Sequence, residues 1–176
     1  MKWLVVLLVI LTSPSYAKIG DVIEQKGITD IERKGGEKYE QIDRDFDVES
    51  YDTVRTKNGR TAIQFLDETR VDVTENSKLV IDEFVYDPNT STGTLALKAS
   101  FGTVRYASGQ IAKNSKQNVK ISTPTAVIGV RGTDFSMTVD ETGSSTIILL
   151  PSCTKVADEL LCVTGEIEVT SDVGTV

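Results

Sequence analysis

Carboxylates are the main chemically active side chains of this chain of 176 residues, which contains 26 aspartates and glutamates and no histidine. Without histidine it lacks the commonest metal ligand and the usual general base near neutral pH. Two acids at suitable separation can hydrolyse a glycosidic bond, and the pairs Asp67 with Asp72 and Asp140 with Glu141 are candidates. Acidic chains contain many accidental pairs, and the sequence shows no nucleophile with its base and no phosphate-binding glycine loop. We therefore expect no enzymatic activity and no cofactor, with a carbohydrate-active enzyme as an alternative.

A row of four carboxylates at alternate positions runs from Asp43 to Glu49. On a β-strand all four would point to one face, about 7 Å apart. An EF-hand calcium loop starting at the first of them would need glycine at its sixth position and glutamate at its twelfth, but Val48 and Val54 stand there. We interpret the row as a solvated acidic edge that discourages pairing with other strands. A calcium site of another kind stays open as an alternative.

Cys153 and Cys162 are the only cysteines. Structural zinc sites want four ligands, so two cysteines without histidine do not indicate zinc. We expect a disulfide between them, which the loop-entropy model values at about 2–3 kcal/mol. The interval between them could hold a short helical turn or a loop, and we expect the bond to close a disulfide hairpin in the C-terminal extension.

The N-terminal residues 1–17 have the pattern of a secretory signal peptide. Lys2 precedes the apolar run Trp3 to Leu11, and Ser15-Tyr16-Ala17 is a small-x-small cleavage pattern. The run is too short to span a bilayer, although a retained signal anchor is the alternative. We therefore expect an exported, periplasmic or secreted chain that starts near Lys18 and has no membrane span.

Short β-branched runs separated by turn residues predict an all-β domain at residues 18–150, followed by an extension at 151–176. Asn58-Gly59 predicts a hairpin, Asp67-Glu68 a turn, and the polar stretch Ala107 to Asn118 an exposed loop. Gly165 to Val169 predicts a closing strand. The turn spacing permits either a solenoid or a sandwich of the jelly-roll kind. The net charge of −7 argues against binding to nucleic acid.

The stretch Thr123 to Phe135 has the most unusual local pattern. It begins with an X-Pro dipeptide, continues with an apolar run, and places Gly129 and Gly132 on either side of Val130-Arg131. Glycines in a strand-like run mark a bulge, a bend or a close approach of another backbone. We expect a tight corner in which Arg131 satisfies backbone carbonyls or a carboxylate such as Asp134, so that Arg131→Lys lowers stability. The alternative is a ligand or partner contact.

This stretch resembles the signature of the FecR domain, which is found in bacterial envelope proteins. The matching residues are Thr123, Pro124, Ala126, Val127, Gly129, Val130, Arg131, Gly132, Thr133 and Phe135. A second part resembles the family's "Gly-Asp-x-Val-Arg-Thr", "Phe-x-Asp-Gly" and Asn-Ser elements, and its matching residues are Asp52, Val54, Arg55, Thr56, Phe65, Asp67, Asn76 and Ser77. Tyr51 and Glu68 stand where the family pattern has glycine, so we expect turns of different geometry there.

The resemblance covers about Ile19 to Val169 and implies a β-solenoid-like or rolled β architecture. In the family, the domain lies in the periplasm of inner-membrane regulators that relay outer-membrane transporter occupancy to a sigma factor. The sequence shows neither their anti-sigma helix bundle nor their membrane span, so we do not expect direct sigma-factor control. We expect a non-enzymatic sensing, scaffolding or protein-binding module with a protein partner in the cell envelope, with strand addition as one binding mode. A surface structural or adhesin-type module is the alternative.

Overall fold

The computed structural model describes residues 17–115, 117–157, 159–171 and 174–175, and nearly all of its elements are strands. The elements are β1 (Lys18–Lys26), β2 (Thr29–Glu32), β3 (Lys38–Tyr39), β4 (Asp47–Glu49), β5 (Thr53–Thr56), β6 (Arg60–Phe65), β7 (Arg70–Val73), β8 (Lys78–Asp87), β9 (Thr92–Ala107), α1 (Gln110–Asn114), β10 (Val119–Ser122), β11 (Ala126–Val130), β12 (Asp134–Val139), β13 (Ser145–Leu150), β14 (Ser152–Val156), β15 (Glu159–Val163), β16 (Ile167–Ser171) and β17 (Gly174–Thr175). The all-β prediction is confirmed. The predicted signal peptide falls on residues that lie outside the described part, apart from Ala17. In the part of the chain that is described, no helix has the length and hydropathy needed to cross a membrane.

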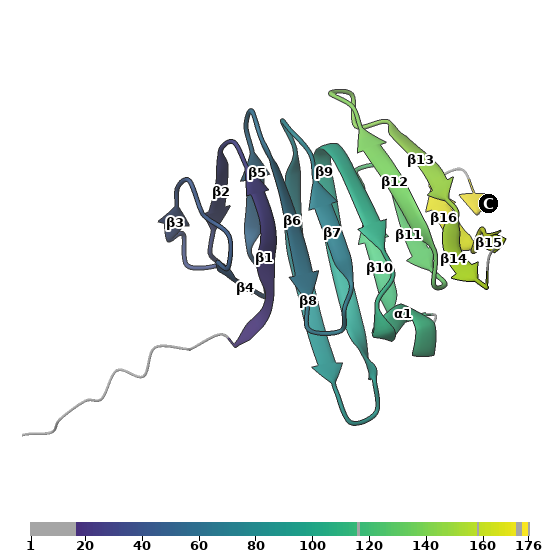
Figure 1. The fold of residues 1–176 in the computed structure, drawn as a ribbon. Coiled ribbons are helices and arrows are strands. Elements are labelled where there is room, and N and C mark those ends of the chain that lie inside the picture. The colour runs from purple at the N-terminus through teal and green to yellow at the C-terminus, as the bar shows by residue number, and fades with distance from the viewer. Residues whose placement is uncertain (1–16, 116, 158, 172–173, 176) are drawn as a thin grey trace, which may run out of the picture.

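Fifteen strands form one curled sheet, and the long strand β9 connects its two halves (Figure 1). The first part of β9 pairs with β8 and β10, and the part from Gly102 onward pairs with β7 and β12. One half-sheet therefore contains β4, β1, β6, β7, the end of β9, β12 and β13. The other contains β3, β2, β5, β8, the start of β9, β10, β11, β16 and β17. All pairs are antiparallel except β9 with β10. The choice between a solenoid-like roll and a sandwich stays a prediction.

Inward-facing apolar side chains of both half-sheets join in one core. Alternation along the strands produces it: on β12, for example, Phe135, Met137 and Val139 are buried and the residues between them are not. Tyr106 of β9 packs against Phe135 with ring centroids 5.3 Å apart. The period of two in the sequence thus places one face of each strand in this core.

The chain crosses between the half-sheets at a column of stacked corners. The backbone N–H of Lys57 donates to Ile28 O at 2.9 Å, and the N–H of Asn76 donates to Lys57 O at 2.9 Å. Gly27 and Gly59 lie against each other in this column. They are so close that a Cβ on Gly27 would lie 2.6 Å from the Cα of Gly59. The hairpin predicted at Asn58-Gly59 is therefore wrong, because β5 and β6 belong to different half-sheets. Gly59 instead allows the backbones of two neighbouring corners to lie close together.

The stretch Ala107 to Asn118 is not the exposed loop that its polar composition predicted. It contains the short helix α1, whose Ile111 and Ala112 are completely buried. Two adjacent apolar residues were sufficient to anchor one helical turn against the core, although lysines and asparagines surround them.

The disulfide between Cys153 and Cys162 is formed. The two cysteines lie directly opposite each other in the hairpin β14–β15, which is a separate two-stranded sheet. The structure thus has the predicted disulfide hairpin, but the interval within it consists of two paired strands and not of a helical turn or a loop. After the hairpin, β16 returns to pair with β11.

Candidate functional site

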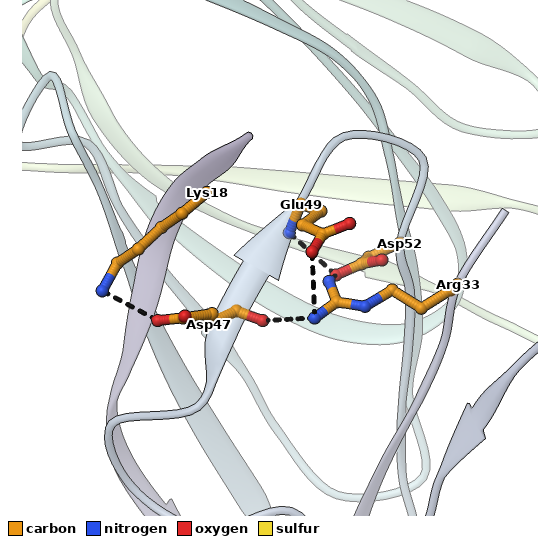
Figure 2. Close-up of polar contacts among 5 residues, drawn as sticks. All are labelled: Lys18, Arg33, Asp47, Glu49 and Asp52. Carbon is orange, nitrogen blue, oxygen red and sulfur yellow. Dashed lines mark hydrogen bonds and ion pairs between the residues drawn. The ribbon is translucent and has the colours of Figure 1, made fainter. Parts of the chain in front are cut away.

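Arg33 clamps three segments near the start of the curled sheet (Figure 2). Its Nη1 donates to Asp52 Oδ2 at 2.5 Å, and its Nη2 donates to the backbone oxygen of Asp47 at 2.9 Å. The same Nη2 lies 3.5 Å from Glu49 Oε1. Since Arg33 follows β2, Asp52 precedes β5 and the other two residues belong to β4, one guanidinium connects elements from both half-sheets.

Asp52, the acid of the first signature element, is completely buried. Its Oδ2 also accepts the backbone N–H of Glu49 at 2.9 Å, whereas its Oδ1 has no hydrogen-bond partner among the described residues. Burial raises the pKa of Asp52 to about 6, against the opposing effects of the Glu49 N–H and Arg33. The guanidinium of Arg33 in turn lies over the rings of Tyr39 and Phe46. With both charged groups enclosed, this cluster is suited to holding segments together and not to binding a substrate.

The acidic row does not form one strand face, which corrects the prediction. Strand β4 contains only its last part, and Asp45 has a positive φ of 67° that interrupts extended structure. Asp47 pairs with Lys18 at 2.8 Å, as Figure 2 shows, and this contact lowers its pKa. Within the described residues, no group of three or more histidine, cysteine, aspartate or glutamate side chains is placed to hold a metal ion.

The two candidate acid pairs are engaged in separate contacts. Asp67 is buried, and its Oδ2 accepts from Thr69 Oγ1 at 2.8 Å and from the Ile111 N–H at 3.2 Å, which ties the β6–β7 turn to α1. Asp72 instead pairs with Arg70 at 2.8 Å. Asp140 accepts from the Thr142 hydroxyl in the β12–β13 turn, which lowers its pKa. These contacts give local structural roles to Asp67, Asp72 and Asp140, three of the four acids that the sequence offered for catalysis.

Ser77 of the Asn-Ser element lies inside the corner column. Its Oγ accepts the Thr103 N–H at 3.0 Å, and its own N–H donates to Thr56 Oγ1 at 3.0 Å. A Cβ on Gly102 would lie 2.1 Å from Ser77 Oγ, so the bend of β9 needs glycine opposite this serine. Thr56 and Ser77 therefore connect three consecutive corners at which the chain crosses from one half-sheet to the other.

Tyr51 and Glu68 keep the backbone conformation that glycine favours. Their φ angles are 72° and 68°, both in the left-handed region. The predicted difference from the family's turn geometry stays a prediction. The surrounding hydrogen bonds and packing impose the conformation on residues that adopt it at a cost of about 1–2 kcal/mol each.

The C-terminal signature contributes both buried and exposed positions. Val130 and Phe135 are fully buried, and Thr133 Oγ1 donates to Glu166 O at 2.7 Å. Thr123 is also buried, and its Oγ1 accepts the Ala126 N–H at 3.0 Å. Gly132 has a φ of 78° and forms the predicted corner.

Arg131 is not held in a crowded corner, which corrects the second part of that prediction. Its side chain is 42% exposed and pairs with Glu168 at 2.7 Å and, at 3.9 Å, with Glu166. Asp134 instead accepts the Ser108 N–H. Alternation along β11 places Arg131 on the outer face of its half-sheet, and sequence reasoning missed Glu168 because it lies on β16.

An open apolar edge lies at the other end of the curled sheet. Strand β13 contains no charged residue and, among the described strands, pairs only with β12. Its Ile148 is 59% exposed. The hairpin that follows also exposes large apolar side chains. We call this set the apolar edge: Ile148, Leu149, Leu160, Leu161 and Val163.

One family model, described as "FecR protein", matches residues 52–151. The matched range begins at the buried Asp52 and ends just after β13, so it contains the signature residues described above. No curated protein and no solved structure matches the chain.

Proposed function

The chain belongs to the FecR family, and we propose that it is an exported, non-enzymatic module that binds a protein partner in the cell envelope. The family's association with envelope signalling supports a sensing or scaffolding role. The disulfide of the β14–β15 hairpin is consistent with an oxidising compartment outside the cytoplasm. The signal-peptide pattern of residues 1–17 adds independent support.

The observation that carries the binding role is the apolar edge. Edge strands are usually protected by charges, bulges or covering segments, and β13 has no charged residue along its length. Exposed apolar groups concentrated in one region mark protein interaction sites. A partner strand added to β13 would pair its free backbone groups and cover Ile148.

The signature residues support a binding role over a catalytic one. Asp52, Asp67 and Ser77 are buried and bonded within the fold. A catalytic acid must instead reach its substrate. These three buried signature residues thus build the domain, and binding is left to groups exposed on the surfaces of its strands.

Affinity capture from an envelope extract tests this proposal, with the chain as bait. Ile148→Lys places a charge on the apolar edge and should lower recovery of a specific protein by about tenfold, since burying an unpaired lysine costs more than 1.4 kcal/mol. Val85→Lys is the matched control, because Val85 is 57% exposed on β8, away from this edge. Equal recovery by the two variants would contradict the assignment of the edge.

Fractionation tests the location. The chain should be released with periplasmic proteins, with its cysteines oxidised. Recovery in the cytoplasm with free thiols would contradict export, and digestion by protease added to intact cells would favour the surface-module alternative.

A further inference from the structure

Gly129, at the centre of the C-terminal signature, has neither of the two usual structural reasons to be glycine. Its φ lies outside the left-handed region, and a Cβ built on it would meet nothing closer than Glu168 at 3.8 Å, an ordinary contact. Elsewhere in the fold the close-approach reason is evident: a Cβ would lie 2.5 Å from a backbone oxygen at Gly20 and 2.2 Å at Gly59. A glycine in a strand that leaves open space above it favours the close approach of a molecule from outside.

The open space above Gly129 is a hollow of about 250 Å³ on the outer face of the half-sheet. Strand register fixes its sides, because Lys120 of β10 and Glu168 of β16 are the direct cross-strand neighbours of Gly129. Arg131, which directly follows β11, also lines the hollow. The side chains of Lys120, Arg131 and Glu168 thus surround Gly129, which has no side chain of its own.

The charges of the hollow favour an anion. Lys120 forms no ion pair with any residue of the described part. Arg131 is paired with Glu168, so it already binds a carboxylate at the rim. Glu166, outside the lining, lies 3.9 Å from the same guanidinium, so the cation available to a further anion is Lys120.

We propose that this hollow binds an aspartate or glutamate side chain of an extended segment of the partner protein. The segment's backbone passes over Gly129, and its carboxylate lies between Lys120 and Arg131, where it competes with Glu168 for the guanidinium. This inference rests on the proposed function, since it assumes a protein partner, but it uses a different surface from the apolar edge. It gives the glycine and the arginine of the signature a shared role in recognition.

Peptide titration of the isotope-labelled chain by NMR tests the proposal. The probe is a short extended peptide with one central glutamate, blocked at both ends, and the control probe is its glutamine counterpart. The glutamate peptide should shift the amide signals of Gly129 and Lys120 and bind about tenfold more tightly than the glutamine peptide, as expected for a charge-assisted contact. Equal binding of the two peptides, or binding of neither, would overturn the proposal.

Two variants sharpen the test. Gly129→Val places a side chain where the peptide backbone would pass and should abolish these shifts without lowering the melting temperature, because a Cβ there makes only ordinary contacts. Glu168→Gln removes the internal competitor and should tighten binding of the glutamate peptide, whereas a hollow that accepted a cation would lose affinity. Failure of this inference is distinguishable from failure of the proposed function, because capture through Ile148 does not depend on either variant.

Discussion

Removing the buried carboxylate of Asp52 should destabilise the fold more than any exposed charge substitution. Asp52→Ala leaves Arg33, whose side chain is only 14% exposed, without its closest acceptor, and it also leaves the Glu49 N–H without a partner. Breaking a buried pair by removing one member costs about 3–5 kcal/mol. Because Glu49 lies 3.5 Å from the guanidinium and compensates in part, we expect a loss of about 3 kcal/mol in the free energy of unfolding.

The raised pKa of Asp52 determines the direction in which pH changes the free energy of unfolding. The pKa of Asp52 is raised from 3.8 to about 6 on folding, so the folded chain binds a proton that the unfolded chain releases between these values. The stability that Asp52 gains from this proton uptake is therefore fully present below about pH 4 and is lost as the pH rises through about 6, whereas its hydrogen bonds to Arg33 and Glu49 remain. The free energy of unfolding of the wild-type chain should rise, relative to that of Asp52→Asn, as the pH falls from about 7 to about 5.

Urea denaturation of the wild-type chain, Asp52→Ala and Asp52→Asn at several pH values measures both effects. The asparagine variant is the matched control because it keeps the shape and one acceptor oxygen but cannot titrate. If Asp52→Ala changed the free energy of unfolding by less than about 0.5 kcal/mol, as an exposed pair would, the clamp would not be a structural element. A wild-type chain that lost stability relative to Asp52→Asn on acidification would refute the direction of the pKa shift.

Three further substitutions have defined outcomes. Glu68→Gly should raise the free energy of unfolding by about 0.5–1 kcal/mol in urea, because relief of a positive φ outweighs the exposed contact with Gln110; a loss of stability would show that the turn relaxes to another conformation. Ser77→Ala should lower it by about 2 kcal/mol because the Thr103 N–H loses its acceptor, and an unchanged value would mean that the corner repacks. Arg131→Lys should change the thermal unfolding free energy by less than about 0.5 kcal/mol, since its ion pair is exposed; a larger loss would restore the structural role that the sequence predicted.

The fold class, the disulfide and the family could be predicted because each has a local signal. Alternating β-branched runs identified strands, and two cysteines in a chain predicted to be exported indicated a bond. The signature at Thr123 to Phe135 was specific enough to identify the family from the sequence alone, and the family model confirms it.

The wrong predictions arose where distant segments decide the structure. Asn58-Gly59 has the sequence of a hairpin turn, yet it crosses between half-sheets because Gly27 packs against it. Arg131 was predicted to be enclosed because glycines flank it, but the partner strand β16 leaves its side chain half exposed. In the Arg33 clamp only Asp52 had a signal in the sequence, as a signature residue; its pairing with Arg33 had none, since the members come from three separate segments.

Site-specific photo-crosslinking in living cells tests the central claim most directly, which is that a protein partner binds at the apolar edge. A photoreactive amino acid at position 148 should yield one discrete adduct with an envelope protein, and the same group at position 85, equally exposed on β8, should not. Identical adduct patterns from both positions, or no adduct from position 148, would contradict the account.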